Sequence, residues 1–243
     1  MIMSISSTLQ QLLRNKDEVV GRTLGEGLTT KEFTALFTLC LGLMVGYGLL
    51  IGARYDALQA AVSAIKLPLL FLLTAAICFP TLYMFLSYLG IRQGLKQLMG
   101  LLLLSLTYIS LVLAAFAPVT FFFLITTNGY EFYKFINIVV FGIAGFIGIR
   151  LFYAQMGEII STAWPKLQVT TDEGGHLIMP ATNNKQKAQW FLMAWAVMFA
   201  LIGAQLSYTL SPFFGDPTKT FILINEGGSN FFLDVRETIR NIK

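Results

Sequence analysis

The chain has 243 residues, of which 56% are hydrophobic and 12% are charged, and its formal net charge is +4. Ordinary soluble domains contain about 25% charged and roughly 45–50% apolar residues, so this composition excludes a typical soluble domain. The modest net charge also lacks the strongly basic character that nucleic acids require, and we expect no nucleic-acid partner. The balance is typical of a protein that crosses a membrane several times and has small parts outside it.

Residues 1–29 are expected to form a cytoplasmic, amphipathic N-terminal segment. From Ser7 to about Leu24 the apolar residues follow helical spacing, and Ser7 with Gln10 matches a capping box. Such a helix either lies on the membrane surface or on the protein's own loops, or it docks a partner. The segment lacks the apolar core of a cleavable signal peptide, so we expect the first span to act as an uncleaved signal anchor.

The apolar run from Leu98 to Leu124 contains no Asp, Glu, Lys, Arg or His. A helix crosses a bilayer with about 20 apolar residues, so this run predicts a transmembrane helix that is long enough to tilt. Four further runs predict spans, and a capping box of Thr29 and Glu32 begins the first of them. The five predicted spans form a transmembrane domain over residues 30–210 and cover about 30–52, 67–90, 98–124, 132–154 and 188–210.

Three of the spans carry small residues on one face. Small residues four apart let two helix backbones approach closely in lipid. We expect these faces to pack helices together within the chain, with homodimerisation as the alternative, and we expect Gln205 to hydrogen-bond between helices. The predicted helix-packing residues are Gly42, Gly46, Gly48, Gly52, Gly142, Gly145, Gly148, Ala196, Ala200, Ala204 and Gln205.

Two prolines predict bends in the spans. Pro80 lies near the middle of the second span and Pro118 lies inside the third, and each removes a backbone hydrogen bond from its helix. We therefore predict helix kinks at both residues. Pro68 suits the first turn of the second span, and Lys66 is expected to mark a membrane edge.

The segments outside the membrane are short except for two. Residues 155–187 form the longest predicted loop, in which Val169 to Met179 predicts a hairpin around Glu173-Gly174-Gly175. Residues 211–243 form an extracytoplasmic tail with a strand-like run at 221–224 and a final helix capped by Ser229 or Asn230. The apolar residues of that helix, which predict a helix at the membrane interface rather than a sixth span, are Phe231, Phe232, Val235, Ile239 and Ile242.

The predicted fold is thus an all-α integral membrane protein with five transmembrane helices, an N-terminal amphipathic helix and a C-terminal interfacial helix. Five spans place the termini on opposite sides of the membrane. With the N-terminus inside, nine basic residues near span ends face the cytoplasm and four face the other side, which favours a cytoplasmic N-terminus under the positive-inside rule. The nine are Lys16, Arg22, Lys31, Arg92, Lys96, Arg150, Lys166, Lys185 and Lys187, and the four are Arg54, Lys66, Lys134 and Lys219.

The residues that carry chemistry are sparse. Cation-coupled transport needs ionisable groups at mid-membrane depth, whereas the span interiors offer Asn137, Gln205 and hydroxyl groups. His176 is the only histidine and has no second metal ligand nearby in the sequence. Cys40 and Cys78 lie in apolar runs and are expected to be small buried hydrophobes. We predict no catalytic, cofactor-binding or metal-binding residues and no cofactor.

The Pro-kinked apolar helix around Ile77-Cys78-Phe79-Pro80-Thr81-Leu82-Tyr83, together with five spans, an amphipathic N-terminus and glycine-rich helices, resembles the Yip1-like family of small five-span membrane proteins. The likeness covers about residues 30–210. The long loop before the last span and the tail after it depart from the family's pattern. The resemblance implies a role in membrane trafficking or membrane organisation rather than in catalysis.

Three classes of function follow. The first is a non-enzymatic multi-pass membrane protein that acts as an accessory subunit, assembly factor or membrane-organising scaffold of a larger complex. Its expected partners are membrane lipids and other membrane proteins, in a homo- or hetero-oligomer. The alternative is a passive channel or carrier for a small neutral or lipidic solute, and a lipid-modifying enzyme ranks last.

Overall fold

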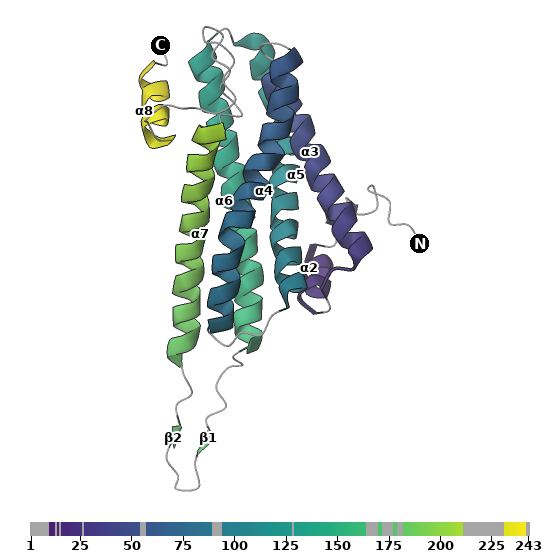
Figure 1. Cartoon of the computed structure of the whole chain (residues 1–243), viewed down its shortest axis with the longest axis vertical. Helices are drawn as coiled ribbons and strands as arrows, with labels where there is room; N and C mark the ends of the chain where they lie inside the picture. The colour runs from purple at the N-terminus through teal and green to yellow at the C-terminus, as the bar shows by residue number, and fades with distance from the viewer. Residues whose placement is uncertain are drawn as a thin grey trace.

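The computed structural model describes residues 10–12, 14, 16–25, 27–53, 57–88, 94–127, 129–163, 170–171, 177–178, 182–210 and 231–241. Within these residues the chain is almost entirely helical (Figure 1). The helices are α2 (Lys16–Gly25), α3 (Thr30–Gly52), α4 (Ala57–Tyr88), α5 (Leu95–Thr126), α6 (Tyr130–Ala163), α7 (Thr182–Leu210) and α8 (Phe231–Asn241). Two short strands, β1 (Thr170–Thr171) and β2 (Leu177–Ile178), lie between α6 and α7.

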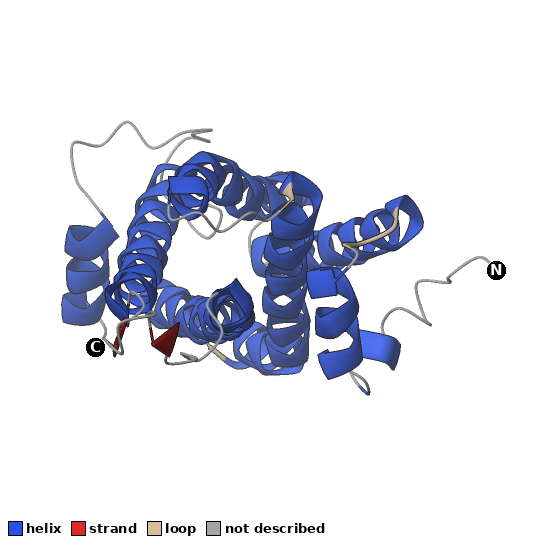
Figure 2. Cartoon of the chain, turned by 90° about the horizontal axis from the view of Figure 1, so that it is seen from below, coloured by secondary structure: helices blue, strands red, loops and turns tan. Residues whose placement is uncertain are grey.

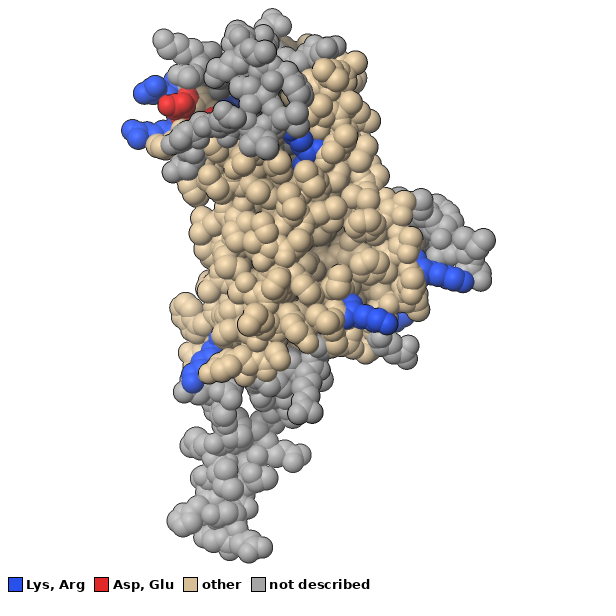
Figure 3. Space-filling model, in the orientation of Figure 1, with Lys and Arg blue, Asp and Glu red and all other residues tan. Residues whose placement is uncertain are grey.

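Five of the helices, α3 to α7, are long and apolar enough to cross a membrane. Their apolar segments are Thr30–Gly52, Ala57–Tyr88, Leu95–Thr126, Phe132–Ser161 and Gln186–Leu210. On the face drawn in Figure 3, lysine and arginine lie toward the two ends of the molecule, and the surface between them carries no charge. Because hydrocarbon excludes unpaired charge and exposed backbone, the chain is an integral, multi-pass membrane protein.

The five long helices are arranged in a ring (Figure 2). Around it, α3 packs on α4 and α5, α7 packs on α4 and α6, α5 packs on α6, and α4 also touches α5. Side chains fill the middle: Phe141 of α6 stacks on Phe71 of α4, with ring centroids 6.0 Å apart, and meets Tyr47 of α3 edge-on. One continuous apolar core therefore joins all five helices.

The first span begins and ends where the sequence predicts. The Thr29 backbone N–H donates to Glu32 Oε2 at 3.0 Å, and the Glu32 N–H donates to Thr29 Oγ1 at 3.3 Å. This reciprocal pair is the predicted capping box, which satisfies two backbone donors at the start of α3. The sequence prediction of Thr30 to Gly52 is confirmed.

The second and fourth spans are longer than the sequence predicts. α4 begins at Ala57, ten residues before Leu67, so Pro68 lies inside the helix and not in its first turn. α6 continues to Ala163 and takes in the first residues of the predicted loop 155–187. The extension of α6 forms because Met156, Ile159 and Ile160 recur at helical spacing and are all buried in the core.

A helix occurs at each place where the sequence predicts one outside the bundle. The buried Val19 and Val20 of α2 lie in a cluster with Leu36 and Leu39 of α3 and with α5. α2 therefore packs on α3 and α5 of its own chain rather than on loops, and a position at the membrane surface stays a prediction. α8 packs against α6 and α7 near the other end of the bundle (Figure 1). The amphipathic and interfacial roles of the two helices stay predictions.

The strands β1 and β2 pair antiparallel, with Thr170 opposite Ile178 and Thr171 opposite Leu177. This pairing agrees with the hairpin predicted over Val169 to Met179. The turn at Glu173-Gly174-Gly175, the run at 221–224 and the capping residues Ser229 and Asn230 lie outside the described residues.

Candidate functional site

Two of the predicted packing glycines bring α3 into backbone contact with α4. A methyl group at Gly48 would lie 2.7 Å from the Cα atom of Ala64, and one at Gly52 would lie 2.5 Å from the Cα atom of Ala60. No side chain fits at those distances. The pair Gly48-x-x-x-Gly52 is therefore an intramolecular packing site, as the glycine spacing predicts.

Gly148 makes the corresponding contact between α6 and α5. A methyl group there would overlap the side chain of Ile109. The remaining predicted glycines are placed differently: Gly42, Gly46, Gly142 and Gly145 have no other atom within 4 Å of the methyl position. Among the described residues these four glycines do not pack inside the chain, and their use against another helix stays a prediction.

α7 approaches α4 at Gly203, where a methyl group would lie 3.5 Å from Thr74 Cγ2. The indole Nε1 of Trp195 donates to the Cys78 carbonyl oxygen at 3.0 Å and fixes the same pair of helices. Ala200 and Gln205 are exposed, while Ala196 and Ala204 are half-buried, and no hydrogen bond from the Gln205 side chain to another described helix occurs.

A buried hydrogen-bonded cluster joins three spans. The Tyr47 hydroxyl of α3 lies 2.9 Å from Thr120 Oγ1 of α5 and donates to Asn137 Oδ1 of α6 at 3.4 Å. The Asn137 amide in turn donates to the Tyr133 carbonyl oxygen at 2.9 Å. All three side chains are buried. Since such bonds hold helices in one register, the cluster fixes α3, α5 and α6 relative to one another.

Four other hydroxyl groups inside the spans bond to their own helices. Thr74, Ser105, Thr107 and Ser110 each donate to a backbone carbonyl oxygen three or four residues earlier, at 2.7–3.1 Å. Such bonds satisfy the hydroxyl locally. These groups therefore do not line a polar path.

α8 is attached to α6 by an ion pair. Lys134 Nζ donates to Asp234 Oδ1 at 2.8 Å, and the two side chains are 8% and 21% exposed. Thr238, one turn further along α8, is buried beside α6 and α7. The sequence places Lys134 near a membrane edge and gives no sign of its partner, which lies a hundred residues away.

Lys66 is buried inside α4, and its position at a membrane edge stays a prediction. It lies in the interior of α4, nine residues after the helix begins, and is only 6% exposed. Among the described residues no carboxylate lies within ion-pair distance of its amine and no hydrogen bond reaches it. The predicted start of the second span near Leu67 was too late, because Lys66 interrupts the apolar run although the helix continues through it.

Gln155 is, after Lys66, a second buried polar side chain inside a span that has no polar partner among the described residues. It is 2% exposed, and neither atom of its amide has a hydrogen-bond partner among the described residues. It falls at the start of the predicted loop 155–187. The apolar residues that follow it at helical spacing were the available signal that the helix continues.

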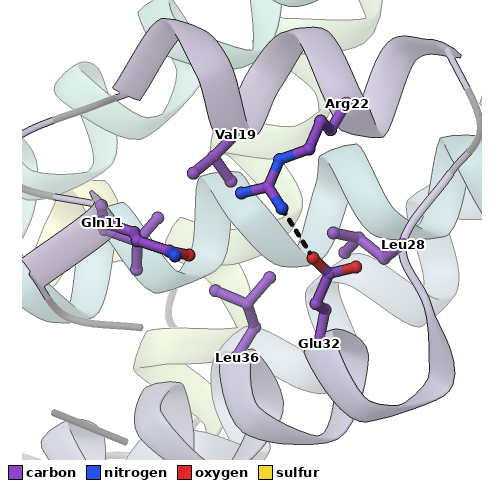
Figure 4. Close-up of a pocket in the computed structure, with 7 residues that line it drawn as sticks. Gln11, Val19, Arg22, Leu28, Glu32 and Leu36 are labelled. Atoms are coloured by element: carbon purple, nitrogen blue, oxygen red, sulfur yellow. Dashed lines mark hydrogen bonds and ion pairs between the residues drawn. The ribbon is translucent and has the colours of Figure 1, made fainter. Parts of the chain in front are cut away.

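Gln97 of α5 bonds the end of α2, and Tyr108 of α5 bonds Leu12, which precedes α2. Gln97 Nε2 donates to the Gly25 carbonyl oxygen at 2.7 Å, and Tyr108 Oη donates to the Leu12 carbonyl oxygen at 2.9 Å. Between α2 and α3 lies a cavity of about 20 Å³, where Arg22 Nη1 meets Glu32 Oε1 at 3.0 Å (Figure 4). That volume accommodates about one water molecule.

The remaining cysteine and carboxylate side chains that the structure describes do not form a common site. Cys40 and Cys78 are free, buried thiols, which confirms the prediction that they are buried. No group of three or more His, Cys, Asp or Glu residues is arranged to hold a metal ion within the part of the chain that the structure describes. His176, Asp172 and Glu173 lie outside that part.

Comparison with known proteins gives no relative. No family model, no curated protein and no solved structure matches the chain. The resemblance to the Yip1-like family therefore stays a prediction.

Proposed function

We propose that this chain is a non-enzymatic membrane protein that packs against other membrane proteins, as an accessory subunit, assembly factor or membrane-organising scaffold. One observation carries the proposal: a ridge of small residues runs along the outside of α3. The ridge consists of Thr34, Thr38, Gly42 and Gly46, which are all exposed and spaced four residues apart.

The ridge is suited to close helix contact. Thr34 Oγ1 donates to the Thr30 carbonyl oxygen and Thr38 Oγ1 donates to the Thr34 carbonyl oxygen, both at 2.8 Å. The hydroxyl groups are therefore satisfied within α3. Over Gly42 and Gly46 the space is open, so another helix could approach the α3 backbone there as closely as α4 does at Gly48.

The two glycine pairs of α3 serve different sides of the helix. Gly48 follows Gly42 by six residues, which is roughly a third of a turn around an α-helix from the ridge. The inner pair is occupied by α4, and the outer pair faces away from the bundle. α6 repeats the arrangement, with Gly148 against α5 and with Gly142 and Gly145 open. The proposal is thus supported by two features of the bundle. Some small residues of α3 and α6 hold the helices of the chain together, and others on the same helices have open space beside them, where a further helix can pack.

Extraction in a mild detergent followed by native mass measurement tests the proposal. We expect the wild-type chain to be recovered in a complex, and we expect Gly42→Leu with Gly46→Leu to reduce that complex about tenfold or more, as closely packed small-residue interfaces do not accept bulk. Ala76→Leu, at an exposed small residue of α4, is the matched control and should leave the complex intact. A solitary wild-type protomer, or a complex that the ridge variant leaves unchanged, would count against the proposal.

The alternative is a passive channel or carrier for a small neutral or lipidic solute, which would cross the membrane within the ring of α3 to α7. The stacked Phe71 and Phe141 fill the ring at one level, so a pathway would require them to move. Solute flux into proteoliposomes is the test, with Pro80→Ala and Pro118→Ala to examine gating by the predicted bends. Flux at the level of protein-free liposomes would exclude this function.

A further inference from the structure

Lys66 is a buried, positively charged residue that has no anionic partner among the described residues. Its side chain is 6% exposed within an apolar span, and no carboxylate among the described residues pairs with it. A buried, unpaired charge costs free energy, and such residues inside membranes generally face a partner or a binding site. Ser63, one turn earlier on α4, is also buried, and its hydroxyl has no hydrogen-bond partner in the described chain.

From these groups we infer that Lys66 and Ser63 bind the anionic headgroup of a membrane lipid. The chemistry recognised is a phosphate or carboxylate oxygen, because an ammonium and a hydroxyl both donate to such acceptors. The site is distinct from the α3 ridge and does not depend on whether the ridge binds another protein.

The surface beside Lys66 is apolar and exposed, as contact with the acyl chains of a lipid requires. Ile65, Leu69, Leu73 and Ile77 recur every four residues along α4 and are 69%, 41%, 37% and 51% exposed. This apolar stripe runs from the level of Lys66 toward the C-terminal end of α4. Acyl chains lying along the stripe would place their headgroup at the level of the amine.

The depth of Lys66 also suits a headgroup. It follows the start of α4 by nine residues, which is roughly 14 Å along an α-helix. A lysine side chain extends toward the membrane surface and keeps its amine near the headgroup region. The lipid would therefore belong to the leaflet at the N-terminal end of α4, with its chains directed toward the bilayer centre.

The test compares lipids of identical acyl chains and different headgroups. Phosphatidylglycerol and phosphatidylcholine are added at equal ratio to the delipidated protein, and the unfolding midpoint is measured. We expect phosphatidylglycerol to raise the midpoint by roughly 5 °C more than phosphatidylcholine. We expect Lys66→Gln to lose most of that difference, whereas Lys66→Arg keeps it. Lys96→Gln, which removes an exposed lysine of α5, is the matched control and should behave as the wild type.

A second variant keeps the test valid if Lys66→Gln does not fold. Leu69 is exposed and three residues from Lys66, so Leu69→Glu supplies a carboxylate within reach of the amine. It should abolish the preference for phosphatidylglycerol and raise the midpoint of the lipid-free protein. Equal shifts with both lipids in the wild type, or an undiminished preference in Lys66→Gln, would overturn the inference. An equal shift with inorganic phosphate alone would overturn the lipid as the source of the anion.

Discussion

Gly48 and Ala64 place the backbones of α3 and α4 in direct contact. A methyl group on Gly48 would lie 2.7 Å from both the Ala64 Cα atom and the Ser63 carbonyl oxygen. Both are backbone atoms, so neither can move aside as a flexible side chain would. The hairpin of the first two spans therefore depends on the absence of a side chain at this position.

Gly48→Ala should destabilise the protein by about 1–3 kcal/mol, because the added methyl group forces the two helices apart. Gly42→Ala, on the same helix but with open space around it, should be neutral or stabilising by up to about 1 kcal/mol. Thermal unfolding in one detergent compares the two. Equal stability of both variants would mean that the close approach at Gly48 is not present in the folded protein.

Tyr47→Phe should cost about 0.5–2 kcal/mol, since it removes the hydroxyl that joins Thr120 and Asn137. Tyr153→Phe is the control, because that tyrosine is exposed on α6. Denaturant unfolding of both variants and of a double variant with Thr120→Val measures the coupling. If Thr120→Val costs as much in the Tyr47→Phe background as in the wild type, the two side chains do not interact.

Asp234→Asn should release α8 from α6. The variant leaves Lys134 without its charged partner, and we expect a loss of roughly 1–3 kcal/mol, less than for a fully buried pair because Asp234 is partly exposed. Limited proteolysis of the C-terminal segment reports the release. Glu237→Gln, an exposed residue of the same helix, should leave the digestion pattern unchanged, and faster cleavage in that variant alone would contradict the role of the pair.

Gln155→Leu should stabilise the protein by about 1–2 kcal/mol, since it replaces a buried amide that has no hydrogen-bond partner in the described chain. Gln189→Leu changes an exposed glutamine of α7 and should have little effect. The thermal unfolding midpoints of the two variants and of the wild type measure these effects. A clear loss of stability in Gln155→Leu would show that the amide holds a polar partner inside the membrane.

The sequence predicts the spans well because hydropathy and capping are local properties. Thr29 and Glu32 mark the start of α3 within one turn of chain. By contrast, a single charged residue misplaces a boundary: Lys66 ends the apolar run, yet the helix extends to Ala57. In the same way, polar residues after Ala154 suggest a loop, although Met156 and Ile160 bury one side of a continuing helix.

The sequence does not predict which helix packs against each helix face. Spacing shows that Gly42 and Gly48 are both suited to helix contact, and it does not show that α4 takes only the second. The bond from Trp195 to Cys78 and the pair of Lys134 and Asp234 join residues about a hundred or more positions apart. Periodicity assigns residues to faces, while the partner of a face depends on the whole arrangement of the bundle.

The positions of the two termini relative to the membrane, which the five spans among the described residues predict to be on opposite sides, test the account most directly. Five membrane-crossing helices separate α2 from α8, and the excess of basic residues predicts that the α2 side is cytoplasmic. Tags at the two termini can be probed in intact and in permeabilised cells. The account predicts that the N-terminal tag is protected until permeabilisation and that the C-terminal tag lies on the opposite side of the membrane. Two tags on the same side would contradict it.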